Sequence, residues 1–68
     1  MGKMTLSALR TNAKLTQKEV AKALKRSNKT ISKWENGVSF PKPKDIDAIC
    51  KLYNVTYDDI NFLHNDSL

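Results

Sequence analysis

The sequence predicts a single all-α domain, and three observations support that fold class. Apolar residues recur at the three- and four-residue spacing of amphipathic helices, whereas the alternation typical of strands is absent. Residue types that begin and end helices follow one another at short intervals. A chain of 68 residues has room for only one hydrophobic core. We therefore expect five short helices in one domain over residues 1–68, with a frayed tail at residues 65–68.

The first two helices are predicted at about residues 5–12 and at residues 17–24. Thr16 is suited to cap the second helix, because Glu19 lies three residues later and completes a capping box. Helical spacing then defines the side of each helix that faces the core. The predicted inner residues of these two helices are Leu6, Leu9, Val20, Ala21 and Leu24.

The third helix is predicted at about residues 28–36. Ser27 is suited to cap its start, and Gly37 is suited to the left-handed conformation that commonly ends a helix. The inner face of this helix carries Ile31 and Trp34. A tight turn at about residues 25–27 joins it to the preceding helix, so the two form a helix-turn-helix unit over about residues 15–37.

A fourth helix is predicted to begin at Pro43, because proline favours the first helical position, and Asp45 suits its positively polarised first turn. Asn54 is placed to end this helix in the left-handed conformation. Thr56 then caps a predicted fifth helix over residues 57–64. The expected core residues of these two helices are Ile46, Ile49, Cys50, Leu52, Tyr53, Ile60 and Leu63.

The chain carries no pattern typical of a metal site or an active site. Cys50 and His64 are the only soft metal ligands, and neither belongs to a pair with metal-ligand spacing. Asp58 and Asp59 resemble paired catalytic carboxylates, but they lie in the first turn of the predicted fifth helix, where capping explains them. A glycine-rich phosphate loop is also absent. We therefore expect no enzyme activity, no metal and no cofactor.

Composition also indicates where such a protein works. No apolar stretch reaches the roughly 20 residues that span a bilayer, and the N-terminus lacks the apolar segment of a signal peptide. A single cysteine cannot form a disulfide within the chain. These features favour the reducing cytoplasm and no membrane partner.

Charge is divided unevenly along the chain. Residues 1–44 carry a net charge of +9, whereas residues 45–68 carry −4. Lys29 and Lys33 lie four residues apart on the third helix, so their ammonium groups are neighbours and repel each other unless an anion lies between them. A solvated polar face remains the alternative. The outward residues of this helix are Asn28, Lys29, Ser32, Lys33 and Asn36.

Several segments together resemble the helix-turn-helix family of the lambda-repressor/Cro type, also called the xenobiotic-response-element family. The resemblance covers residues 6–63, and it implies a compact five-helix, lambda-repressor-like fold. It implies a sequence-specific, double-stranded DNA-binding regulator of transcription, a repressor of phage or bacterial type. An antitoxin or a protein-interaction module built on the same fold is the alternative. The matching segments are Leu15-Thr16-Gln17, Glu19-Val20-Ala21, Thr30-Ile31-Ser32 and Trp34-Glu35-Asn36-Gly37.

The resemblance also implies which residues contact DNA. The residues expected to reach base edges are Asn28, Lys29, Ser32 and Lys33. The residues expected to contact phosphates or the groove wall are Gln17, Arg26, Ser27, Thr30, Asn36 and Lys42, with Lys44 as an alternative to Lys42. Arg10 and Glu35 match a pair that ties the first helix to the end of the third in some members of the family.

This chain departs from the family pattern at two places. Relatives usually have glycine where this chain has Lys25 and an apolar residue where it has Arg26, so the turn is either strained or differently shaped. Relatives often have polar or basic residues at the positions of Val38 and Phe40. Phe40 is expected either to cover the core or to mark a contact surface.

The resemblance further implies a palindromic operator, because one short helix supplies few base contacts and such domains usually bind as dimers. We expect a weak homodimer, formed through the region of the predicted fifth helix. The residues expected at its interface are Tyr57, Phe62 and Leu63.

Overall fold

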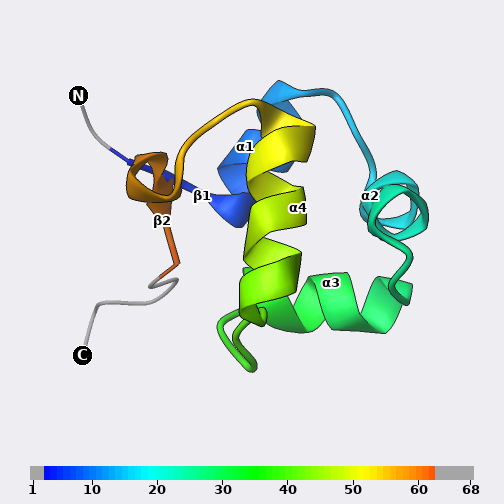
Figure 1. Ribbon diagram of the computed structural model, residues 1–68. Coiled ribbons are helices and arrows are strands. Elements are labelled where there is room, and N and C mark those ends of the chain that lie inside the picture. The colour runs from blue at the N-terminus through cyan, green and yellow to red at the C-terminus, as the bar shows by residue number, and fades with distance from the viewer. Residues whose placement is uncertain (1–2, 63–68) are drawn as a thin grey trace.

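Four α-helices make up most of the computed structural model, which describes residues 3–62. Helices α2 and α3 cross steeply, and in this view α4 lies in front of α1 and beside α2 (Figure 1). α2 packs against both α3 and α4, and α1 packs against α3. The helices are α1 (Leu6–Asn12), α2 (Gln17–Leu24), α3 (Asn28–Glu35) and α4 (Pro43–Tyr53).

Side-chain caps fix where the first three helices begin. The Thr5 hydroxyl accepts a hydrogen bond from the Ala8 amide at 3.0 Å. At the start of α2, the Thr16 hydroxyl accepts from the Glu19 amide at 3.0 Å, and the Glu19 carboxylate accepts from the Thr16 amide at 2.8 Å. Each bond satisfies an amide that the first helical turn leaves without a partner. The predicted capping box and the predicted bounds of α2 are therefore confirmed.

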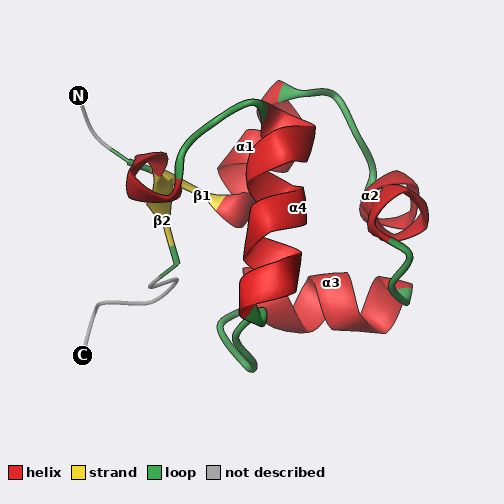
Figure 2. Cartoon of the chain, viewed as in Figure 1, coloured by secondary structure: helices red, strands yellow, loops and turns green. Residues whose placement is uncertain are grey.

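The predicted fifth helix is wrong. Only residues Tyr57–Asp59 are helical, as one 3₁₀ turn, and the chain then extends into strand β2 (Ile60–Asn61). β2 pairs in parallel with strand β1 (Met4–Thr5) (Figure 2). Ile60 lies opposite Met4, and Asn61 lies opposite Thr5. The all-α prediction is therefore corrected in this respect: the described residues are mostly helical but include a short two-stranded sheet. Residues 63 and 64, the end of the predicted helix, lie outside the described residues.

Two interactions explain why the extended form replaces a helix here. The Asp59 carboxylate accepts hydrogen bonds from the amide and the hydroxyl of Thr56, at 2.9 and 3.0 Å, and this closes the short turn. The hydrogen bond from the Thr56 backbone amide also lowers the pKa of Asp59. The backbone of Ile60 then pairs with β1, in register with Met4, while the Ile60 side chain is 3% exposed in the core. An inward-facing Ile60 suits either conformation, so its spacing alone did not distinguish them.

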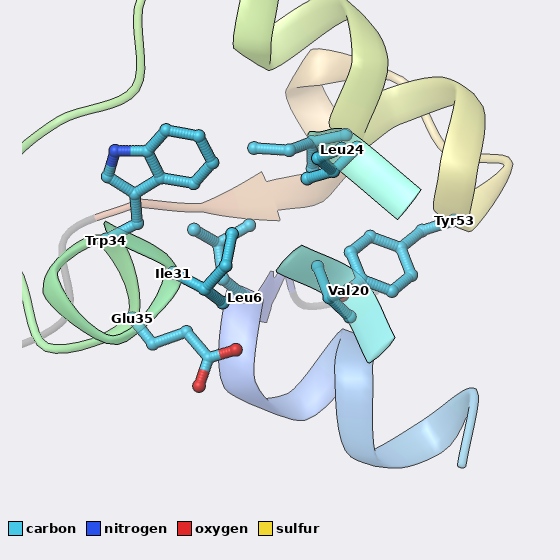
Figure 3. A pocket seen from close by; sticks show the side chains of 8 residues that line it. Leu6, Val20, Leu24, Ile31, Trp34, Glu35 and Tyr53 are labelled. Atoms are coloured by element: carbon cyan, nitrogen blue, oxygen red, sulfur yellow. The ribbon is translucent and has the colours of Figure 1, made fainter. Parts of the chain in front are cut away.

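The core draws on every helix and on β2. Figure 3 shows side chains from α1, α2, α3 and α4 converging around a cavity of about 10 Å³, which is no larger than one water molecule needs. Leu24, Cys50, Leu52 and Tyr53, which were expected inside, pack at the edge and are only partly buried. The buried apolar residues are Leu6, Leu9, Val20, Ala21, Ile31, Trp34, Ile49 and Ile60.

Tyr53 ends α4 beside the core and beside the buried Glu35. Partial burial disfavours the phenolate, and the negative charge of Glu35 acts in the same direction, so the pKa of Tyr53 rises from 10.0 to about 12.

We expect this phenol to remain neutral in the folded protein at pH values where an exposed tyrosine has ionised. Because the folded pKa is the higher one, its contribution to stability is present below pH 10 and is lost as the pH rises through 12. Ultraviolet titration of a Tyr57→Phe variant follows Tyr53 alone. A midpoint near 10 with the helices intact would contradict the expectation.

An ion pair ties α1 to the end of α3. Arg10 Nε lies 2.7 Å from Glu35 Oε2, and Arg10 Nη2 donates to Glu35 Oε1 at 3.2 Å. Glu35 is 7% exposed and the Arg10 side chain is 19% exposed, so the carboxylate is buried and the guanidinium is partly buried. Its hydrogen bonds to Glu35 raise the pKa of Arg10, and Arg10 Nη1 also donates to the carbonyl of Leu15 at 2.9 Å. The pair that the family resemblance implies is therefore confirmed.

The sequence left two possibilities for the turn between α2 and α3, a strained turn or one of another shape, and the structure has the strained turn. Lys25 adopts the left-handed conformation, with φ 58° and ψ 45°, in a position that glycine occupies more comfortably. Lys14 and Asn54 are also left-handed, and Gly37 ends α3 with φ 73° as its sequence position predicts.

Lys25→Gly is expected to stabilise the domain by about 1 kcal/mol, because glycine removes the steric cost of the left-handed turn. Lys22→Gly is the matched control: it removes the same charge from a position inside α2, where glycine costs about 1 kcal/mol. Urea denaturation of both variants measures the difference. Equal destabilisation by the two substitutions would show that the turn carries no strain.

Candidate nucleic-acid interface

One face of α3 packs into the core, and the opposite face is exposed to solvent. Ile31, Trp34 and Glu35 are each at most 7% exposed. Asn28, Lys29 and Lys33 are exposed on the opposite side, and Ser32 is half-buried between them. None of the ion pairs found among residues 3–62 includes Lys29 or Lys33. The structure thus presents the four residues expected to reach base edges on one polar, cationic surface.

Hydrogen bonds fix the hydroxyl and amide side chains at each end of α3. The Ser27 hydroxyl accepts from the Thr30 amide at 3.1 Å and lies 3.0 Å from the Thr30 hydroxyl. At the other end, Asn36 Nδ2 donates to Ser32 Oγ at 3.2 Å. Two pairs of predicted contact residues are therefore brought together, each with its rotamers restricted. Such restriction lowers the entropy lost when a ligand binds.

Gln17 lies at the start of α2, next to the end of α3. Its Nε2 donates to Glu35 Oε1 at 3.0 Å, so the carboxylate that binds Arg10 also orients this amide. Gln17 is half-buried, which leaves its amide oxygen and second N–H available to a ligand. Glu35, which pairs with Arg10, thus also positions Gln17, the predicted phosphate contact at the start of α2.

Arg26 binds Asp45, at the start of α4. Arg26 Nε and Nη2 lie 2.9 and 2.8 Å from the same oxygen, Asp45 Oδ1. Sequence reasoning missed this pair, since Asp45 was assigned to the helix dipole. A cation at a position where relatives carry an apolar residue was the available signal, because an acidic partner nearby is one way to accommodate it.

An open cavity of about 360 Å³ lies beside this pair. It brings together Arg26, Thr30 and Lys42, three of the residues expected to contact phosphates, although they come from the turn, from α3 and from the loop before α4. The other residues that line it are Trp34, Ser39, Phe40 and Asp45. Three donors around one concavity suit an anion.

Aromatic rings form a second exposed feature, which we call the aromatic patch: Phe40, Tyr57 and Phe62. The centroid of the Phe62 ring lies 5.0 Å from that of Phe40 and 5.4 Å from that of Tyr57. Phe40 is 57% exposed and Tyr57 is 54% exposed. Phe40 therefore marks a surface rather than covering the core. Two residues of the expected dimer interface lie together here, and the third, Leu63, lies outside the described residues.

The described residues offer little support for other kinds of site. No group of three potential metal ligands occurs within residues 3–62. Cys50 is half-buried, and burial raises the pKa of its thiol, which makes it less reactive. Within the same part of the chain, no helix is both long enough and apolar enough to cross a bilayer.

Comparison with known proteins places this geometry in context. Residues 4–63 match the family model described as the helix-turn-helix domain. The chain is 40% identical over 55 residues to the HTH-type transcriptional activator BcrR of Enterococcus faecalis, covering 81% of the chain and 27% of that protein. It is also 40% identical over 55 residues to the antitoxin PezA of Streptococcus pneumoniae, again over 81% of the chain and over 35% of that protein.

A third relative is the HTH-type transcriptional regulator DicA of Escherichia coli, which is 46% identical over 43 residues. That alignment covers 63% of the chain and 32% of DicA. The chain therefore spans about a third of the length of the curated relatives it matches.

Proposed function

Because the chain belongs to the helix-turn-helix domain family, we propose that it binds double-stranded DNA sequence-specifically and regulates transcription, as a repressor. The observation that carries the proposal is the outward face of α3, where Asn28, Lys29, Ser32 and Lys33 lie together while the opposite face is fixed in the core. Two of the similar proteins are named as an HTH-type activator and an HTH-type regulator of transcription, which supports regulation of transcription.

In this proposal α3 enters the major groove. Asn28 pairs with adenine through its amide, and Lys29 and Lys33 donate to the acceptor edge of guanine. Ser32 lies between them and donates or accepts according to the base it meets. The mutual repulsion of the two lysines is replaced by attraction to DNA.

Contacts to the DNA backbone set the register of α3 in the groove. Phosphates bind at the start of α2 and around α3, and the loop before α4 supplies a further contact. These contacts carry most of the sequence-independent affinity and make binding sensitive to salt. The residues that make them are Gln17, Arg26, Ser27, Thr30, Asn36 and Lys42.

We propose that two copies bind a palindromic operator as a weak homodimer. The aromatic patch supports this assignment, since exposed rings lose water when they pack against a second copy. The interface residues are Tyr57 and Phe62, together with Leu63. In this role the protein acts in the cytoplasm, on the nucleoid.

Selection of bound DNA from a random pool tests the proposal. The expected result is a selected motif with two inverted half-sites about one helical turn apart. A selected motif without symmetry would contradict the homodimer while leaving DNA binding intact. A pool that shows no enrichment after repeated rounds would contradict sequence-specific binding itself.

A protein-interaction module, such as an antitoxin, is the second candidate. The aromatic patch and the relative named as an antitoxin favour it. Pull-down from lysate treated with nuclease separates the two functions. A stoichiometric protein partner that survives nuclease would favour the interaction module, whereas loss of the captured material with the nucleic acid would favour the DNA-binding regulator.

A further inference from the structure

Arg26 presents two different edges to its surroundings. One edge, formed by Nε and Nη2, is held by Asp45 Oδ1 at 2.9 and 2.8 Å. The side chain of Arg26 is nevertheless 42% exposed, whereas the side chain of Asp45 is only 10% exposed. The guanidinium is therefore anchored from within the protein and open toward solvent. Its fixed planar shape means that fixing one edge also fixes the direction of the other donors.

Arg26 lines the cavity of about 360 Å³ described above. Thr30 and Lys42 line the same cavity and bring a hydroxyl and an ammonium group to it. A phosphate of the DNA backbone matches these donors in charge and in geometry, because guanidinium groups bind phosphate with two parallel hydrogen bonds. The cavity adjoins α3, so an occupant here would lie beside the helix that enters the groove.

We propose that Asp45 is a positioning residue for DNA binding: it holds the guanidinium of Arg26 so that the free edge meets a backbone phosphate in this cavity. The inference rests on the proposed function and adds a residue that makes no contact with DNA. It has a consequence that opposes simple electrostatics. Removing an acid near a polyanion should strengthen binding, whereas removing Asp45 should weaken it, because Arg26 is then free to adopt other rotamers.

The test measures the affinity for a short mixed-sequence duplex as a function of salt concentration. The number of phosphates neutralised sets the slope of log K against log salt, at about 0.9 per phosphate. Asp45→Ala is expected to lower affinity roughly tenfold at fixed salt and to reduce the slope by about 0.9. Asp45→Asn keeps a side-chain oxygen for Arg26 to donate to, so it should retain most of the affinity and the slope.

A double-mutant cycle tests whether Asp45 acts through Arg26. Asp45→Ala is expected to have no further effect in an Arg26→Ala background. Thermal unfolding of each variant sets a temperature at which all are folded. If Asp45→Ala does not fold, Arg26→Ala and Asp45→Asn carry the test: the first must lose one phosphate from the slope and the second must not.

Three outcomes would overturn the inference: tighter binding by Asp45→Ala, an unchanged salt slope in Arg26→Ala, or an equal loss from Asp45→Ala with and without Arg26. Each leaves DNA binding by the unaltered protein in place. Failure of the unaltered protein to bind any duplex would instead contradict the proposed function. The two failures are therefore distinguishable.

Discussion

Replacing Lys29 and Lys33 together with alanine is expected to abolish the preference for the selected operator over mixed-sequence DNA. Both side chains are exposed on the outward face of α3, and neither takes part in the ion pairs of the described residues. A good base contact contributes about 1–3 kcal/mol of discrimination, so the pair accounts for a loss of roughly a hundredfold or more. A mobility shift at constant salt measures it.

The matched control for this experiment is Lys18→Ala with Lys22→Ala. These two lysines are also four residues apart and exposed, but they lie on α2. The control removes the same charge and should lower affinity for both DNAs alike, with the preference retained. Operator preference that survives in the Lys29/Lys33 variant would show that α3 does not read the sequence.

Glu35→Ala is expected to remove most of the stability of the domain. The substitution leaves Arg10 without its carboxylate and deprives Gln17 of an acceptor. Removing one partner of a buried ion pair costs about 3–5 kcal/mol, and a small domain has little more than that in total. Urea unfolding followed by circular dichroism gives the loss directly.

Two further variants make this measurement specific. Asp47→Ala breaks the pair with Lys51 and should cost under about 1 kcal/mol, because the side chains of Asp47 and Lys51 are 69% and 79% exposed. The combination Arg10→Met with Glu35→Leu removes both charges of the pair and should recover much of the stability that Glu35→Ala loses. An equal cost for Glu35→Ala and Asp47→Ala would mean that burial adds nothing to the Arg10–Glu35 pair.

Local signals in the sequence predicted α2 and α3 well, because a helix start depends on residues close to it. Each cap joins two residues that are only three positions apart, so both partners can be recognised within one short segment of sequence. These pairs are Thr16 with Glu19 and Ser27 with Thr30. The exposed face of α3 followed from the same reasoning, since burying Ile31 and Trp34 leaves the opposite side free.

Contacts between distant parts of the chain were beyond such reasoning. The resemblance, not the spacing, indicated the Arg10–Glu35 pair, and nothing in the local pattern linked Arg26 to Asp45. The C-terminal strand was missed for the same reason. Ile60 extends because β1, near the other end of the chain, pairs with its backbone, and the spacing of residues around position 60 gives no indication of that strand.

The parallel pairing of β1 with β2 has a consequence for how the domain opens. Each strand has only two residues, so neither persists when the other departs. Thr5 belongs to β1 and also caps α1, which means that fraying there loosens the first helix as well. The two ends of the described chain should therefore exchange their amide hydrogens as one cooperative unit. Opening at either end is in effect opening at both.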